Sequence, residues 1–264
     1  TTLRVVYTPF VHGPETMMTY LVEQKVLFSC EEFGGYGSLN GGIFDDQYPD
    51  LTFYENEALR YFTNIVAPFS KSVLSAISKF EDMPIEVVAP SHGLIWRKSP
   101  GRILELYQRW STYYRSPAYV GITALFGTMY RNTEQALSAA LEGIAAEEVP
   151  VRVYDVSRTH VSFMLSDLWT RRGVLVAAPT YEGGLFPVMQ DVLNMANRKR
   201  VAHKQSAYLG SYAWGGGAQD DFKRMADTLD WTVTGEMAFC GGPMAEDLER
   251  AYALGGQLAR AVKA

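Results

Sequence analysis

The chain has 264 residues, of which 47% are hydrophobic and 20% are charged, and its formal net charge is -5. This composition supplies a packed core and excludes a disordered chain, and the acidic balance argues against broad nucleic-acid binding. With no apolar run of the ~18 residues needed to cross a bilayer and only two cysteines, we expect a cytoplasmic protein without membrane insertion, although a single disulfide stays an alternative.

The first 115 residues mix short strand patterns with one long helical pattern. Strand-like runs precede a Gly-rich loop over residues 34–42, and a short strand ends just before His92. We expect strand-like runs at 3–11, 19–30 and 85–90, helices at 55–80 and 102–110, and a linker at 111–118. Because the chain enters its first strand directly after Thr1, we expect an amino-terminal portion of this domain to be missing, processed away or supplied by another chain.

The remaining residues, 116–264, alternate strand and helix patterns. The expected strands are 118–126, 149–156, 173–179, 205–214 and 231–239, and the expected helices are 133–147, 161–172, 186–200, 218–230 and 245–264. Five strands, each followed by a helix, predict an α/β domain with a flavodoxin-like, doubly wound, five-stranded parallel sheet. Ligands of such sheets bind at the carboxyl ends of the strands, near the point where the strand order reverses.

Three loops follow three of these strands at the ligand-binding edge. They are "GTMYRNT" at 127–133, "PTYEGGLFP" at 179–187 and "GSYAWGGGA" at 210–218. Hydroxyl groups and helix N-terminal amides suit a phosphate, aromatic rings suit a flat ring system, and glycines allow close approach of the backbone. Each loop alone is compatible with an ordinary turn. Considered singly, Tyr212 or Trp214 is equally compatible with a core residue. Together they predict a flavin mononucleotide (FMN) site.

Histidine and carboxylate residues in the first part form a second candidate site. His12 and His92 flank the stretch "LFSCEEFGG", which contains Glu31 and Glu32. Imidazole and carboxylate ligands together suit iron, manganese or zinc. Considered singly, each histidine is more simply explained as a core or loop side chain with its hydrogen bonds satisfied.

The flavin half resembles the flavodoxin domain of the flavodiiron proteins, also called A-type flavoproteins. Their phosphate loop reads like "TMYGNT", and this chain has "TMYRNT". The resemblance implies that the phosphate is held by the first loop and that the isoalloxazine ring is flanked by the other two. The implied cofactor-binding residues are Thr128, Met129, Tyr130, Arg131, Asn132, Thr133, Pro179, Thr180, Tyr181, Glu182, Gly183, Gly184, Ser211, Tyr212, Ala213, Trp214, Gly215, Gly216 and Gly217. Arg131 stands where glycine is usual, so it either strains a left-handed backbone or contacts the phosphate or a partner.

The first part is similar to the metallo-β-lactamase-like αβ/βα domain of the same family. In that domain a histidine is followed, after eighteen residues, by a bridging aspartate and, after sixty more, by a final histidine. The same two intervals separate His12 from Glu31 and Glu31 from His92. The resemblance therefore implies His12, Glu31 and His92 as metal ligands and catalytic residues, and it extends over essentially the whole chain.

Two departures from the family pattern leave the metal site open. The early ligand cluster H-x-E-x-D-H is absent, and Glu31 replaces the bridging aspartate. A di-iron centre would assemble if a separate polypeptide supplied the other ligands; otherwise the three residues are relics or a weak mononuclear site. We also expect the incomplete domain to expose apolar residues, namely Val5, Val6, Leu27 and Phe28, which would attract a partner.

The resemblance implies an FMN-containing oxidoreductase built from a partial metallo-β-lactamase-like domain at 1–115 and a flavodoxin-like domain at 116–264. Electrons from a small redox protein or a reduced cofactor would pass through FMN to a di-iron site that reduces O2 to water or NO to N2O. A head-to-tail dimer or tetramer, or a chain carrying the rest of the first domain, is the implied partner. The alternative is an electron-transfer flavoprotein subunit whose first domain serves assembly. A weaker alternative is a structural domain in which Arg131 blocks the flavin loop.

Several other residues are interpreted as structural. Cys240 is expected to be a buried thiol, and His160 and His203 are expected at the surface. The basic stretch at 197–201, together with Lys204, is expected to be a solvated helix end, with docking of an acidic electron donor as the alternative.

Overall fold

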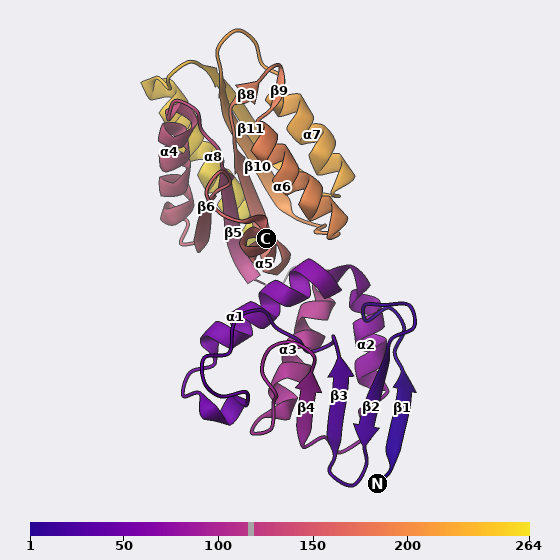
Figure 1. Ribbon diagram of the computed structural model, residues 1–264. Coiled ribbons are helices and arrows are strands. Elements are labelled where there is room, and N and C mark those ends of the chain that lie inside the picture. The colour runs from indigo at the N-terminus through magenta and orange to yellow at the C-terminus, as the bar shows by residue number, and fades with distance from the viewer. Residues whose placement is uncertain (116–118) are drawn as a thin grey trace. The chain divides into compact units, whose positions relative to one another are not determined.

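A computed structural model describes residues 1–115 and 119–264, which form two compact units, Thr1–Tyr114 and Arg115–Ala264 (Figure 1). The end of the expected linker and the first residue of the expected strand at 118–126 lie outside the described residues. Each unit has its own sheet and its own covering helices.

The first unit is built on a four-stranded sheet. Its strands are β1 (Leu3–Tyr7), β2 (Met17–Leu21), β3 (Val26–Cys30) and β4 (Val87–Pro90), and they lie in that order. The pairs β1–β2 and β2–β3 are antiparallel, whereas β3 and β4 are parallel. The strand-like run expected at 19–30 is therefore a hairpin, with its turn at residues 22–25.

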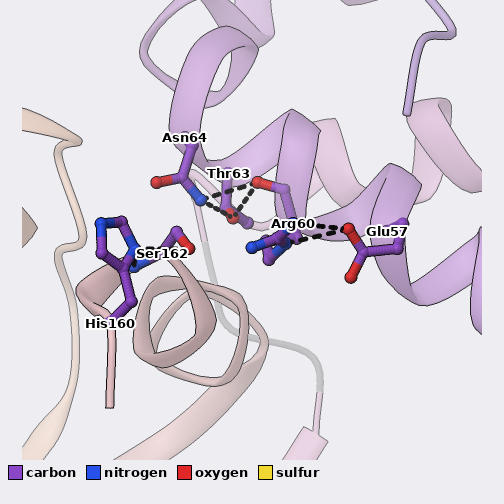
Figure 2. Close-up of polar contacts among 6 residues, drawn as sticks. All are labelled: Glu57, Arg60, Thr63, Asn64, His160 and Ser162. Atoms are coloured by element: carbon purple, nitrogen blue, oxygen red, sulfur yellow. Dashed lines mark hydrogen bonds and ion pairs between the residues drawn. The ribbon is translucent and has the colours of Figure 1, made fainter. Parts of the chain in front are cut away.

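The helical segment of this unit is less regular than expected. The single helix predicted at 55–80 is wrong at its centre, because a π-helical turn and a 3-10 turn interrupt it near Pro68, which has no backbone N–H to donate. Just before the interruption, the Arg60 carbonyl accepts hydrogen bonds from the side chains of Thr63 and Asn64, at 3.1 and 2.7 Å, and the Arg60 guanidinium pairs with Glu57 at 2.7 Å (Figure 2). The elements of the segment and its neighbours are η1 (Asp45–Gln47), α1 (Thr52–Tyr61), η2 (Phe62–Val66), η3 (Ala67–Phe69), α2 (Ser70–Ser78) and α3 (Pro100–Thr112).

Helices cover only one face of the first sheet within the described residues. Strand alternation places Met18, Tyr20, Leu27 and Val88 in the core, where they are buried. The opposite face carries exposed apolar residues: Leu3, Val5, Tyr7, Met17 and Phe28. Two of the residues expected on the open face are not exposed, because Leu27 belongs to the covered face and Val6 is half-buried.

The second unit contains a five-stranded sheet in which all neighbouring strands are parallel. The strands are β5 (Tyr119–Phe126), β6 (Val151–Asp155), β7 (Arg171–Ala177), β10 (Gln205–Tyr212) and β11 (Thr232–Cys240). Their spatial order is β6-β5-β7-β10-β11, which is 2-1-3-4-5 in chain order. The predicted doubly wound, flavodoxin-like sheet is confirmed.

Helices cover both faces of this sheet: α4 and α8 pack together on one face, and α5, α6 and α7 lie on the other (Figure 1). They are α4 (Asn132–Ala146), α5 (Val161–Thr170), α6 (Pro187–Arg198), α7 (Ala218–Thr228) and α8 (Ala245–Lys263). Arg171 and Arg172, expected at the end of a helix, instead begin β7. The exposed His160 caps α5 by accepting the backbone N–H of Ser162 (Figure 2). Across the described parts of the chain, none of the helices is both long enough and apolar enough to span a membrane.

Glycines let α4 and α8 approach each other backbone to backbone. A Cβ added at Gly143 of α4 would lie 2.0 Å from the carbonyl oxygen of Tyr252, and one added at Gly255 of α8 would lie 2.0 Å from that of Ala140. Glycine in mid-helix costs about 1 kcal/mol relative to alanine. The close packing of the two helices therefore explains why glycine occupies these positions.

Gly143→Ala should lower the free energy of unfolding by about 2–3 kcal/mol, because the new methyl group meets rigid backbone and the helices must separate. Urea denaturation measures the change. Gly256→Ala is the matched control, since its methyl group would first meet the flexible guanidinium of Arg260, at 3.2 Å. Equal stability of the two variants would contradict the packing argument.

Candidate functional site

The carboxyl edge of the five-stranded sheet carries a cleft of about 660 Å³. It lies where the loops after β5, β7 and β10 meet, next to the β5–β7 pair at which the strand order reverses. Its lining residues come mainly from the three loops selected in the sequence: Met129, Tyr130, Asn132, Pro179, Thr180, Tyr181, Glu182, Gly183, Ser211, Tyr212, Ala213, Trp214, Gly215, Gly216 and Gly241. The predicted residues Thr128, Arg131, Thr133, Gly184 and Gly217 belong to the same loops without lining the cleft.

The first loop ends at the N-terminus of α4, and its key residue is Arg131. Arg131 has the left-handed φ of 68°, so it bears the backbone strain expected where glycine is usual. Its backbone N–H donates to Thr128 Oγ1 at 2.9 Å, and its side chain is 78% exposed and pairs with Glu134 at 3.1 Å. The guanidinium therefore points to its own helix and does not block the loop.

A short hairpin forms the second wall of the cleft. Strands β8 (Thr180–Tyr181) and β9 (Gly184–Leu185) pair antiparallel around a two-residue turn. Both turn residues have positive φ, 48° at Glu182 and 79° at Gly183, as in a type I′ turn. The turn and Tyr181 are exposed and face the cleft.

The third loop combines aromatic side chains with a run of glycines. Trp214 is fully exposed, and Tyr130 of the first loop is 81% exposed. A buried hydrogen bond of 3.0 Å between Thr133 Oγ1 and Ser211 Oγ joins the first loop to the third. The loops therefore form one connected site.

These residues fit a flat ring system with an anionic tail. The volume lies within the ~300–1,000 Å³ typical of cofactor sites. The free amides at the N-terminus of α4 suit a phosphate, and the exposed rings of Tyr130, Tyr181 and Trp214 suit contact with a planar ring. The site thus has the chemistry that FMN requires.

The candidate metal ligands come together only in part. His12 Nε2 lies 2.7 Å from Glu31 Oε2, so these two side chains already use each other as partners. His92 is exposed and packs near Tyr61, with 5.8 Å between the ring centroids. Within residues 1–115 and 119–264, no three His, Cys, Asp or Glu side chains gather closely enough to hold a metal ion. The residues described therefore do not form a di-iron site by themselves.

Glu32, next to Glu31, is a feature that the sequence analysis did not interpret. Its side chain is fully buried, and neither carboxylate oxygen has a hydrogen-bond partner among the described residues. Burial raises the pKa of this carboxyl group well above its usual value. It lies in the turn that directly follows β3, and no local pattern in the sequence distinguishes it from Glu31.

Glu32→Leu should raise the free energy of unfolding at neutral pH by about 1–3 kcal/mol, because an apolar side chain of similar size removes an unpaired buried carboxyl group. Thermal or urea denaturation measures the gain. The neighbouring Glu31→Leu, which removes a partly exposed carboxylate, is the control and should bring no such gain. A destabilised Glu32→Leu protein would contradict the prediction.

Two structural interpretations from the sequence are wrong. Cys240 is exposed rather than buried, because it ends β11 at the carboxyl edge, where its Sγ faces the Ala213 carbonyl oxygen at 3.6 Å. Lys204 is buried rather than solvated, because the chain turns inward at the start of β10. His203 is exposed, as expected.

Comparison with protein families matches the first part of the chain to a family model. Residues 1–93 match the model described as "ODP family beta lactamase". The matched region contains His12, Glu31 and His92, and it ends one residue after His92. The match supports the interpretation of the first unit as metallo-β-lactamase-like.

Curated relatives match across both units. The chain is 31% identical to a nitric oxide reductase of Moorella thermoacetica, over 97% of this chain and 64% of that protein. It is 33% identical to an anaerobic nitric oxide reductase flavorubredoxin of Shigella flexneri, over 81% of this chain and 45% of that protein. The chain thus spans less than two thirds of either relative.

Solved structures share the fold of the whole chain. Rubredoxin oxygen:oxidoreductase from Desulfovibrio gigas matches 99% of this chain and 65% of its own, with a TM-score of 0.91 and 23% identity. The flavodiiron protein from Giardia intestinalis matches 99% of this chain and 64% of its own, with a TM-score of 0.92 and 23% identity. Across both of its units the chain is therefore similar to the flavodiiron proteins, whose fold it shares.

Proposed function

We propose that this chain is the FMN-containing part of a flavodiiron-type oxidoreductase. The observation that carries the proposal is the single cleft in which three separate loops meet at the carboxyl edge of the sheet. In this proposal FMN supplies the electron-transfer chemistry, and the chain supplies binding, orientation and the surroundings of the ring.

The loops have different roles in the proposed site. The amides at the N-terminus of α4, with Thr128, Asn132 and Thr133, hold the phosphate. The hairpin at 180–185 and the loop at 211–217 flank the ring, and their glycines allow the backbone to approach it. The exposed Trp214 and Tyr130 lie at the rim, where they shield the ring from water.

The proposed reaction of the complete enzyme is the reduction of nitric oxide or dioxygen with electrons from a redox donor. The support comes from relatives named nitric oxide reductase and from a structural neighbour named rubredoxin oxygen:oxidoreductase. We assign the flavin to this chain. The metal centre would need ligands in addition to His12, Glu31 and His92.

The second candidate function is electron transfer by a flavoprotein subunit without its own metal centre. The contact between His12 and Glu31 and the separate position of His92 favour it. The replacement of the bridging aspartate by the longer Glu31 also favours it. In this case the first unit serves assembly.

We propose a protein partner for the open face of the first sheet. An exposed apolar surface on three adjacent strands is formed by Leu3, Val5, Tyr7, Met17 and Phe28. Among the described residues β1 pairs only with β2, so its outer edge is open. A chain carrying the rest of the metallo-β-lactamase-like domain suits this surface. A second copy of the chain, as a head-to-tail dimer or tetramer, is the other proposed arrangement.

Titration of the purified 264-residue chain with FMN tests the flavin proposal. Saturable binding with a perturbed visible spectrum is expected, and a protein that takes up no FMN would refute it. Iron analysis, together with NO and O2 consumption under a reduced donor, separates the two functions. If the chain and its co-purifying partners bind iron, then His12→Ala and His92→Ala should lose iron and activity; unchanged electron transfer would favour the subunit without a metal centre.

A further inference from the structure

The β8–β9 hairpin is too short to hold its own position. Each strand has two residues, and an isolated two-stranded hairpin is only marginally stable in water. Nevertheless Tyr181, Glu182 and Gly183 line the cleft, so their placement determines its shape. Contacts from outside the hairpin must therefore fix it.

The first turn of α7 supplies these contacts. Asp221 Oδ2 accepts the backbone N–H of Leu185 at 2.8 Å, and the Ala218 N–H donates to Thr180 Oγ1 at 3.4 Å. Gly184 leaves room for the carboxylate, because a Cβ there would lie 2.7 Å from the same Asp221 oxygen. One carboxylate, which lies outside the cleft lining, thus holds the second strand of the hairpin.

Asp221 does not line the cleft, so its carboxylate acts on the cleft through the hairpin. Its other oxygen pairs with Arg224, one turn later in α7, and its side chain is 23% exposed. The bond to Leu185 is charge-assisted, and such bonds are roughly twice as strong as neutral ones. The Leu185 side chain is buried beneath the hairpin, so both its backbone and its side chain are fixed.

We propose that Asp221 is a positioning residue that sets the ring-binding half of the flavin cleft without affecting the phosphate-binding half. The inference rests on the proposed FMN site. The phosphate loop belongs to the N-terminus of α4, to which neither Asp221 nor the hairpin is bonded in the contacts above. Loss of the carboxylate should therefore weaken contacts with the ring and leave affinity for the phosphate unchanged.

FMN titration of the 264-residue chain and its variants tests the inference. Asp221→Ala should bind FMN about tenfold more weakly, with a visible spectrum closer to that of free FMN. Asp221→Asn should stay within about twofold of the unchanged chain, because its amide oxygen still accepts the Leu185 N–H. Arg224→Ala is the matched control; it removes the ion pair, keeps the hydrogen bond and should also bind FMN normally.

Competition by inorganic phosphate distinguishes a local effect on the ring-binding half from a general loss of structure, because a general loss would also weaken phosphate binding. Its inhibition constant against FMN should be the same in the unchanged chain and in Asp221→Ala. If Asp221→Ala does not fold, Gly184→Ala provides the second variant, because its methyl group displaces the carboxylate; it should give the same tenfold loss and the same spectrum.

Three results would overturn the inference while leaving the FMN site intact. The first is an Asp221→Ala protein with the affinity and spectrum of the unchanged chain. The second is an Asp221→Asn protein that binds FMN as weakly as Asp221→Ala. The third is an Asp221→Ala protein whose affinity for phosphate falls as much as its affinity for FMN. Absence of FMN binding by the unchanged chain is the distinct result that overturns the proposed function, and the inference with it.

Discussion

Gly217→Ala should reduce FMN affinity by about a hundredfold, the largest loss expected from a single methyl group in this chain. Gly217 has a φ of 145°, which an alanine adopts only with strain. In addition, its Cβ would lie 1.9 Å from the carbonyl oxygen of Gly183. The position of a Cβ is fixed by its own backbone, and the oxygen it meets is a backbone atom, so the loop at 211–217 and the hairpin must move apart. Two walls of the cleft are thus displaced together.

Fluorescence titration with FMN measures this loss, and circular dichroism establishes that the variant is folded. Gly101→Ala, which lies outside the cleft, is the control, because a Cβ there also has no neighbour within 4 Å. It should bind FMN like the unchanged chain. A folded Gly217→Ala protein with unchanged affinity would show that these two walls do not contact the flavin.

Stability should rise with pH between about 7 and 10 because of Lys204. The Lys204 side chain is buried, and its Nζ donates to the carbonyl oxygens of Trp169 and Arg171 at 3.1 and 2.6 Å. Burial lowers the pKa of this lysine from 10.5 to about 7. In this range the unfolded chain keeps a proton that the folded chain releases, so the free energy of unfolding increases with pH, by at most ~1.4 kcal/mol per unit.

Lys204→Met should remove this contribution, so the difference in unfolding free energy between the two proteins should change with pH above about 7 and stay constant below it. Urea denaturation at several pH values between 6 and 9 measures it. Lys263→Met, which removes a partly exposed lysine paired with Glu147, reports the effect of losing any positive charge. A pH-independent difference for Lys204→Met would mean that the two carbonyl groups keep the ammonium charged.

The second unit was predictable because each of its elements carries a strong local signal. Buried parallel strands read as continuous apolar runs, and the intervening helices show a clear 3.6-residue period. Where local signals conflict with tertiary structure, the predictions failed. Arg171 and Arg172 follow a helical pattern, yet they begin β7, where Arg171 pairs with Tyr119 of β5. The helix at 55–80 is interrupted near Pro68.

The candidate site was predictable at the level of loops but not of contacts. Glycine and hydroxyl residues after strands indicate a cleft, whereas the bond between Asp221 and Leu185 joins residues that no local pattern connects. The sequence analysis also missed Gly241 as a residue of the cleft. Gly241 lines the cleft because β11 ends beside β10, and no local pattern shows that the two strands are neighbours. The burial of Glu32 and Lys204 also depends on three-dimensional packing. From sequence alone a charged residue is expected to be exposed to solvent, so neither burial could be predicted.

The backbone contact between α4 and α8 has a consequence for the energetics of the cleft. Gly143 and Gly255 interlock the two helices, so α4 can neither slide nor rotate easily along its neighbour. The amides at its N-terminus are therefore preorganised before any anion arrives. Binding there should require little loss of conformational entropy, so that most of the gross attraction between the helix end and the phosphate appears as affinity.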